Sequence, residues 1–235
     1  MRFSIQRETL LKRLQHVVGV VERRQTLPVL ANLLLVVDTE GVTLTGTDLE
    51  VEMCARTAAD DLVAGETTVP ARKLFDICRA LPDGCKIKLE RSGERVVVNA
   101  GRSRFTLATL PATEFPTIES IEVVERVALS EAALKEVMER TAFAMAQQDV
   151  RYYLNGMLLD LREHSLRCVA TDGHRLAMAE TRFESKVSAP RQVIVPRKGI
   201  GELQGLFEAG ETAIELEFAR NHLRVRRNEK TAQCK

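Results

Sequence analysis

The spacing of apolar residues predicts a long helix near the start of each half of the chain. In residues 6–18, and again in residues 130–143, apolar side chains recur every three or four positions and fall on one helical face. These positions are Leu10, Leu11, Leu14, Val17 and Val18 in the first segment and Leu134, Val137 and Met138 in the second. Ser130 stands where a helix N-cap is expected. Shorter helices are predicted after Pro70 and Pro196, the latter over about 198–208, because proline suits the first helical turn.

Between these helices the pattern changes to the two-residue alternation typical of half-buried strands. Residues 43–45, 86–90 and 104–107 show it most clearly. In the first half, strands are predicted over residues 29–37, 42–47, 50–57, 86–91, 95–100 and 103–110. Each half thus has the order helix, strands, helix, strands. This order predicts an α+β fold of tandem domains, with antiparallel sheets and two helices in each domain on one face.

The two halves are related residue by residue, which indicates a tandem duplication. A shift of 124 positions places Leu10 on Leu134 and Thr47-Asp48 on Thr171-Asp172. The same shift aligns Leu14 with Met138, Leu30 with Leu154, Leu33 with Met157, Leu34 with Leu158 and Val42 with Leu166. With two further residues, Val69-Pro70 matches Val195-Pro196. Any two amphipathic stretches align somewhere, but one constant offset over so many apolar positions is hard to produce by chance.

The repeat sets the expected domain boundaries. We assign residues 1–122 to the first domain and residues 123–235 to the second, with a linker within the proline-containing, acidic segment 111–126. The second copy is expected to be truncated near its last strand. Residues 231–234 alternate only weakly, so a frayed or poorly paired edge is predicted there.

Composition and charge narrow the function classes without naming one. Hydrophobic residues make up 45% and charged residues 29% of the chain, as in soluble globular proteins. No apolar run approaches the ~20 residues of a membrane-spanning helix. The five cysteines are scattered, which argues for reduced thiols in a cytosol and against disulfides or a zinc site. The net charge is only +1, so a surface for nucleic acid would have to gather positive charge locally.

Motifs for catalysis, cofactors and metals are missing from the sequence. Neither a phosphate-binding glycine loop nor a dinucleotide fingerprint is present, and the four histidines lack metal-ligand spacing. Asp172 and His174 could be read as a catalytic pair. The equivalent of Asp172 in the first copy, Asp48, is followed by no histidine, so the shared Thr-Asp could instead hold a turn or shape a binding surface. We expect no cofactor, no metal and no enzyme activity.

Basic residues gather on the predicted helices and the adjoining loops of both copies. They are Arg7, Lys12, Arg13, Arg23, Arg24, Arg72, Lys73 and Arg79 in the first copy and Lys135, Arg140, Arg197 and Lys198 in the second. Each could simply be a solvated helix position. Together they would suit sequence-independent contact with phosphates. Tyr152 and Tyr153, the only tyrosines, could stack on bases or sugars, or could pack in the core.

Several longer segments resemble the beta sliding clamp family of bacterial DNA polymerase III. They are residues 26–30, 44–50, 68–73, 149–157, 171–177 and 193–199. The resemblance covers the whole chain. It implies a homodimeric ring with three such domains in each subunit, which encircles duplex DNA and tethers polymerase and other replication and repair proteins. The family's third domain has no counterpart here, so ring closure is in doubt.

The resemblance also implies two binding sites. The DNA-binding residues it indicates are Arg24, Arg72, Gln148, Tyr152, Tyr153 and Lys198. The partner-peptide pocket, which takes short linear motifs of the polymerase and clamp loader, maps onto Leu154, Thr171, Gly173, His174, Arg175 and Leu176. The rest of the family's pocket comes from elements absent here, so weak binding is expected.

The leading hypothesis is therefore a non-catalytic processivity factor in the bacterial cytoplasm, associated with the nucleoid. The alternative is a truncated clamp that binds partner peptides as a module or decoy without encircling DNA. A DNA-processing enzyme is the third hypothesis, and it would require turnover and a bound metal.

Overall fold

A computed structural model describes the protein over residues 1–21, 27–117, 122–185, 187–207, 212–220, 222–227 and 230–234. The chain divides into two compact units, Met1–Thr117 and Ile118–Lys235. Among the described residues, no helix is both long enough and apolar enough to cross a membrane.

Unit 1 contains nine strands and two α-helices in its described part. They are β1 (Arg2–Gln6), α1 (Arg7–Val18), β2 (Asn32–Val37), β3 (Val42–Thr47), β4 (Val51–Thr57), β5 (Asp60–Val63), β6 (Gly65–Pro70), α2 (Ala71–Ala80), β7 (Lys86–Ser92), β8 (Arg95–Ala100) and β9 (Ser103–Ala108). Short 3-10 helices, η1 (Pro28–Ala31) and η2 (Ala112–Glu114), complete it. The strands form two antiparallel groups, in the orders β5-β1-β7-β8-β9 and β4-β3-β2-β6.

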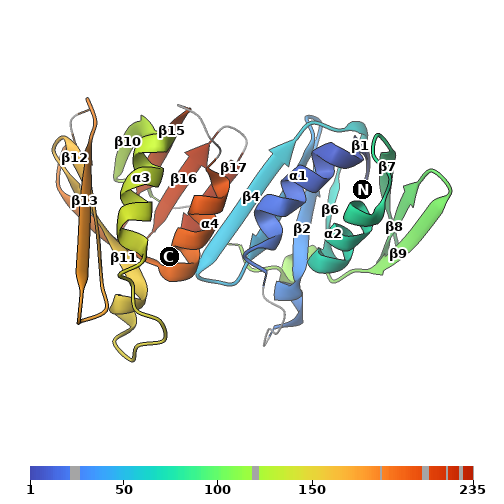
Figure 1. Ribbon diagram of the computed structural model, residues 1–235. Coiled ribbons are helices and arrows are strands. Elements are labelled where there is room, and N and C mark those ends of the chain that lie inside the picture. The colour runs from blue at the N-terminus through green and yellow to red at the C-terminus, as the bar shows by residue number, and fades with distance from the viewer. Residues whose placement is uncertain are drawn as a thin grey trace. The chain divides into compact units, whose positions relative to one another are not determined.

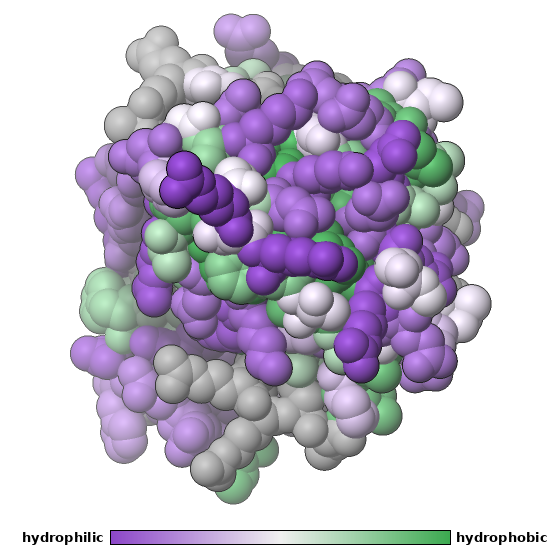
Figure 2. All heavy atoms as spheres, turned by 90° about the vertical axis from the view of Figure 1, so that its right-hand side faces the viewer, coloured by the Kyte–Doolittle hydropathy of each residue, from purple (hydrophilic) through white to green (hydrophobic). Residues whose placement is uncertain are grey.

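The two helices of unit 1 lie side by side and cover one face of the strands (Figure 1). The helix α1 packs on β3 and β4, and α2 packs on β2 and β6. The apolar face predicted for α1 is the buried one, with Leu10, Leu14 and Val17 fully enclosed. Hydrophilic side chains cover most of the outer surface over β7, β8 and β9, as alternation along these strands requires (Figure 2).

Unit 2 repeats this plan. Its elements are β10 (Glu125–Ser130), α3 (Glu131–Ala142), η3 (Tyr152–Asn155), β11 (Gly156–Arg162), β12 (Ser165–Thr171), β13 (Leu176–Arg182), β14 (Arg191–Pro196), α4 (Arg197–Leu206), β15 (Ala213–Phe218), β16 (Leu223–Arg227) and β17 (Lys230–Cys234). Its strands also form two antiparallel groups, β10-β15-β16-β17 and β13-β12-β11-β14. The helices α3 and α4 pack against each other.

The element bounds confirm the duplication and the α+β class. The helix α3 begins 124 residues after α1, at Glu131 and Arg7, and α4 begins 126 residues after α2, at Arg197 and Ala71. These are the two offsets that the sequence predicts. Ser130 is the N-cap of α3, because its hydroxyl accepts a hydrogen bond from the Ala133 N–H at 3.1 Å.

Three expectations need correction. The predicted frayed edge at residues 231–234 is a regular strand, β17, which pairs with β16 from Cys234 opposite Leu223 to Lys230 opposite Arg227. The strand predicted over 29–37 starts only at Asn32, because Pro28 opens a 3-10 turn. The set of strands predicted for the first copy is incomplete, because β1, β5 and β6 are not among them.

Candidate functional site

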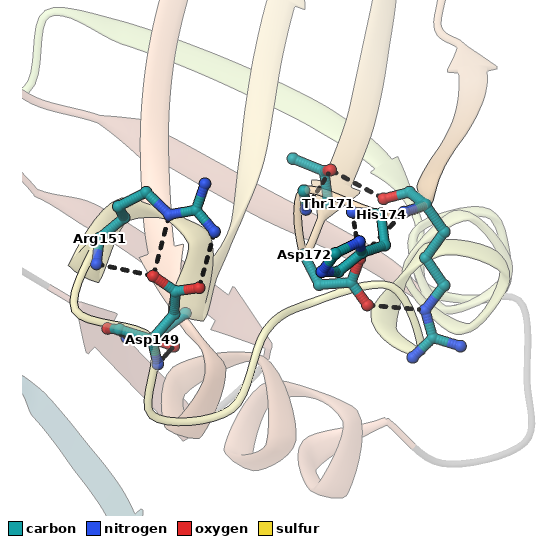
Figure 3. A network of polar contacts seen from close by, with 8 residues as sticks. Asp149, Arg151, Thr171, Asp172 and His174 are labelled. Carbon is teal, nitrogen blue, oxygen red and sulfur yellow. Dashed lines mark hydrogen bonds and ion pairs between the residues drawn. The ribbon is translucent and has the colours of Figure 1, made fainter.

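A hollow of about 460 Å³ opens at one end of unit 2, where the end of α3, the loop between α3 and β11, and the turn between β12 and β13 meet. Its walls include Phe143, Gln148, Asp149, Arg151, His174 and Arg175. Figure 3 shows two polar clusters here, Asp149 with Arg151 on one side and Thr171, Asp172 and His174 on the other. A smaller hollow of about 250 Å³ between α3 and α4 shares Phe143 and Met145 with it. The large hollow therefore combines charged groups with an apolar wall.

The turn between β12 and β13 is fixed by its own side chains. The Thr171 hydroxyl donates to the Arg175 carbonyl at 2.7 Å and accepts from the Gly173 N–H at 3.1 Å. The Asp172 carboxylate accepts from the N–H groups of His174 and Arg175, both at 3.0 Å. The Asp172 carboxylate is thus engaged in hydrogen bonds within the turn. These bonds from the backbone hold its pKa below the usual range.

The first copy builds the same turn. Thr47 donates to the Val51 carbonyl at 2.9 Å and accepts from the Leu49 N–H at 3.1 Å, and Asp48 accepts from the N–H groups of Glu50 and Val51. The turn therefore exists without a histidine. This identity supports the interpretation of the Thr-Asp pair as a structural turn and argues against the catalytic one.

The left-handed position of this turn gives a stability prediction. Gly173 has φ 87° and its counterpart Leu49 has φ 82°. Gly173→Ala is expected to cost about 1 kcal/mol, because an L side chain is strained there and its Cβ would stand 3.2 Å from an Arg151 guanidinium nitrogen. Leu49→Gly should instead gain about 0.5–1 kcal/mol by relieving the strain. Urea unfolding measures both, and shifts of the same sign would contradict this reading of the turn.

The loop opposite the turn is held by Asp149 and Asn155. The Asp149 carboxylate accepts from the Arg151 N–H at 2.8 Å and from its guanidinium at 3.0 and 2.9 Å. The Asn155 amide donates to the Asp149 carbonyl at 2.8 Å, and its oxygen accepts from the Asp149 N–H at 2.9 Å. The loop is thus closed by reciprocal bonds between its two ends.

The Asp149 carboxylate gives a pH prediction. Hydrogen bonds from Arg151 lower the pKa of Asp149 to about 2, against about 3.9 in an unfolded chain. A group with a depressed pKa stabilises the fold above the unfolded value, and this contribution is lost as the pH falls from about 4 through about 2. A carboxyl-carbon NMR titration should place the Asp149 midpoint near 2, and Arg151→Ala should move it up. An Asp149 midpoint near 3.9 in the unsubstituted protein would contradict the paired geometry.

Arg175 joins the turn to the end of α3. Its Nε lies 2.9 Å from an Asp172 carboxylate oxygen, and its Nη2 donates to the Phe143 carbonyl at 2.9 Å. The guanidinium carbon lies 5.5 Å from the centre of the exposed Phe143 ring, which is a cation–π contact. Arg175 therefore shapes the wall of the hollow and also satisfies a carbonyl at the end of the helix.

The predicted partner-peptide residues gather at this end of unit 2. Leu154 is buried beneath the loop, whereas Leu176 is 66% exposed at the start of β13. His174 and Arg175 line the hollow itself, and Thr171 and Gly173 belong to the turn beside it. The sequence analysis did not single out Phe143, Asp149 or Arg151 for this pocket. A signal for Phe143 was present in the sequence, since it is a large apolar residue at the C-terminal end of the helix predicted over residues 130–143.

The predicted DNA-binding residues divide between the units. Tyr152 and Tyr153 are 84% and 50% exposed and meet edge to face with ring centres 6.0 Å apart, so the core-packing alternative is wrong. Gln148 precedes them in a left-handed conformation, with φ 56°. Lys198 lies in the first turn of α4.

In unit 1, Arg72 is exposed on α2 and donates to the Val21 carbonyl at 3.2 Å. Arg24 lies outside the described residues.

Several other helix cations are engaged locally. Arg7 is largely enclosed and ties the start of α1 to the end of α2, through the Cys78 carbonyl at 2.9 Å and through Asp83, just after α2, at 2.7 Å. Arg140 pairs with Glu136 at 2.7 Å and Arg79 with Asp76 at 3.2 Å, each on its own helix. Arg7 is therefore a structural residue, and the basic surface rests on fewer groups than the sequence pattern suggests.

Over the described residues, no group of three or more His, Cys, Asp or Glu side chains stands close enough to hold a metal ion. Cys78 and Cys168 are buried, and burial raises the pKa of each thiol to about 12. Neither is thus a reactive thiolate. The side chains that line the hollow offer hydrogen bonds, charge and apolar contact.

Comparisons with known proteins agree over nearly the whole chain. Residues 1–119 match the family described as DNA polymerase III beta subunit, N-terminal domain, and residues 128–235 match the central domain of the same subunit. A beta sliding clamp of Pseudomonas aeruginosa is 51% identical over 100% of this chain and 64% of its own length. A beta sliding clamp of Escherichia coli is 48% identical over 96% of this chain and 62% of its own length.

Solved structures are similar to the same extent. The sliding clamp of Pseudomonas aeruginosa bound to griselimycin has a TM-score of 0.96 and 51% identity, with 100% of this chain and 64% of that chain covered. The clamp of Caulobacter crescentus has a TM-score of 0.93 and 40% identity, with 100% and 65% covered. The chain thus spans just under two thirds of the length of these relatives.

Proposed function

Because the chain belongs to the family of DNA polymerase III beta subunits, the bacterial beta sliding clamps, we propose that it acts in replication as part of a processivity factor. In this role it contacts duplex DNA without reading its sequence and holds polymerase and clamp-loader proteins through linear peptide motifs. It catalyses no reaction. We assign residues 1–122 and 123–235 to the first two clamp domains and place the protein in the bacterial cytoplasm.

The observation that carries the proposal is the arrangement of side chains at one end of unit 2. There a charged hollow with an apolar wall adjoins a loop bearing two exposed aromatic rings. Small peptide grooves combine an apolar floor with a few fixed polar groups. Here Leu154 and Leu176 would supply the floor and Thr171, His174 and Arg175 the rim. Gly173 allows the turn to approach Arg151 closely.

The proposed DNA contacts suit a protein that must move along its substrate. Lys198, Arg72 and Arg24 would meet phosphates, which carry no sequence information, and Gln148 would hydrogen-bond nearby. Tyr152 and Tyr153 present flat faces on which sugars or unpaired bases could stack. Contact of this kind is moderate and salt-dependent. Processivity would then come from tethering, which raises the effective concentration of the polymerase at the primer end.

A salt-dependent binding experiment tests the DNA half of the proposal. Fluorescence anisotropy with a labelled duplex is expected to show weak, sequence-independent affinity that falls steeply with salt. Because each phosphate contact adds about 0.9 to the slope of log affinity against log salt, Lys198→Ala should reduce the slope by about that amount. Lys86→Ala removes the same charge from β7, where Lys86 pairs with Asp60 at 2.8 Å, and should leave the slope unchanged. Equal slopes for Lys198→Ala and the unsubstituted protein would contradict the assignment.

The alternative function, a peptide-binding module or decoy, makes a different prediction in the same experiment. It requires peptide binding in the hollow together with no measurable affinity for duplex DNA even at low salt. A DNA-processing enzyme would instead turn over a labelled DNA substrate. Measuring affinity for duplex DNA and turnover of labelled DNA therefore separates the three functions.

A further inference from the structure

The loop between α3 and β11 has two distinct sides. Asp149 and Arg151 face the hollow and form part of its wall. Tyr152 and Tyr153 follow directly and expose their rings to solvent. If the proposed function holds, one side of this loop meets the partner peptide and the other meets DNA. The two functions would then depend on one short backbone segment.

Few groups hold this segment in place. The Ala146 N–H donates to the Leu154 carbonyl at 3.0 Å, and the Leu154 N–H donates to the Arg151 carbonyl at 2.8 Å. Val150, at the tip, is 97% exposed and gives no anchorage. The remaining closure comes from the half-buried side chain of Asn155, which bonds both the N–H and the carbonyl of Asp149.

An asparagine suits this position because the closure needs one donor and one acceptor. The side-chain amide supplies both from a single planar group, whereas a carboxylate supplies only acceptors and an aliphatic side chain supplies neither. Asp149, once fixed by Asn155, orients the Arg151 guanidinium through two bonds of 3.0 and 2.9 Å. The position 124 residues earlier is Ala31, whose side chain could make neither bond.

We propose that Asn155 is a positioning residue that sets both sides of this loop, the hollow-lining pair and the tyrosine pair, through its two reciprocal hydrogen bonds with Asp149. The proposal rests on the proposed function for what each side binds. It extends that function because it couples the two surfaces. A ligand bound in the hollow would affect the position of the segment that carries the tyrosines. Asn155 itself touches neither ligand in this scheme.

Two measurements on the full chain test the proposal. In Asn155→Ala, amide hydrogen exchange at Asp149 and Arg151 is expected to rise about tenfold or more. The Asp149 N–H loses its acceptor, and the Asp149 carboxylate, which accepts from the Arg151 N–H, is no longer held in place. The affinities for a short clamp-motif peptide and for a labelled duplex should both fall, each by about threefold to tenfold. Asn155→Asp keeps the acceptor for the Asp149 N–H but loses the donor, so its effects should be intermediate.

The chain provides its own optical reporter of the coupling. It has no tryptophan and only two tyrosines, both in this loop. A peptide free of tyrosine and tryptophan that fills the hollow should therefore change the tyrosine emission of the unsubstituted protein and have little effect in Asn155→Ala. Asn99→Ala, which removes a half-buried amide from β8 in unit 1, is the matched control and should behave as the unsubstituted protein.

The outcomes separate this inference from the proposed function. Unchanged exchange in Asn155→Ala, or a loss of only one of the two affinities, would overturn the positioning role. If the unsubstituted protein binds neither peptide nor DNA, the proposed function fails, and the exchange data still decide whether Asn155 holds the loop. Circular dichroism melting shows whether Asn155→Ala remains folded, and if it does not, the comparison passes to Asn155→Asp.

Discussion

Replacing Arg227 with methionine should lower the free energy of unfolding of unit 2 by about 3–5 kcal/mol. The Arg227 Nε lies 2.8 Å from an oxygen of Glu131, and the two side chains are 8% and 0% exposed. Removing the guanidinium takes an ion-pair partner away from an enclosed carboxylate, and breaking a buried ion pair in this way is costly. Glu131 is also the first residue of α3. The substitution therefore removes an ion pair at the start of this helix.

Urea unfolding followed by circular dichroism measures this loss. The double variant Glu131→Met with Arg227→Met should recover most of it, because an apolar pair removes the desolvation cost together with the attraction. Glu136→Ala is the control, since the Glu136–Arg140 pair on α3 is well exposed and should contribute less than about 0.5 kcal/mol. A loss below about 1 kcal/mol in Arg227→Met would contradict the expected contribution of this buried ion pair to stability.

Arg175→Ala should weaken binding of a clamp-motif peptide about tenfold, equivalent to about 1.4 kcal/mol. The substitution removes one polar wall of the hollow and frees Phe143, on which the guanidinium rests. It also leaves the Phe143 carbonyl without its side-chain donor and Asp172 without its ion pair. The cost in stability should stay near 1 kcal/mol, because both groups are reached by water.

Fluorescence anisotropy with a labelled peptide measures the change in affinity. Arg167→Ala is the matched control: Arg167 stands on β12 of the same sheet and pairs with Glu180 at 2.7 Å, but it does not line the hollow. Its affinity should lie within about twofold of the unsubstituted protein. Equal losses in the two variants would indicate a general effect on the sheet and not a contact at the hollow.

Local signals made much of the fold predictable. The helix α3 follows from its apolar spacing and the Ser130 cap, and both are properties of a few neighbouring residues. The strand β6 was missed because its pattern contains Thr67 and Thr68, which look like surface residues. In the structure Thr68 is buried and satisfied by distant groups, the Asn32 amide at 2.8 Å and the Leu110 carbonyl at 2.9 Å. A local sequence pattern does not indicate hydrogen-bond partners that are so distant in the sequence.

At the site too, contacts between neighbouring residues were predictable and contacts between distant residues were not. The Thr171-Asp172 turn was predictable because all its hydrogen bonds lie within five residues, and the first copy repeats it. The hollow was not, because Phe143 and Arg175 meet across 32 residues of sequence. The DNA and peptide assignments came from family resemblance and await experiment, although the exposure of Tyr152 and Tyr153 is the arrangement they require.

The most direct test of the central claim is an NMR titration of the isotope-labelled protein with a short clamp-motif peptide. Saturable, weak binding in the micromolar to millimolar range is expected. We also expect chemical-shift changes to concentrate at Leu154, Gly173 and Leu176 and to extend to the amides of Asp149 and Arg151. Shift changes confined to other parts of unit 2, or none up to millimolar peptide, would contradict the assignment of this end of unit 2 as the partner site.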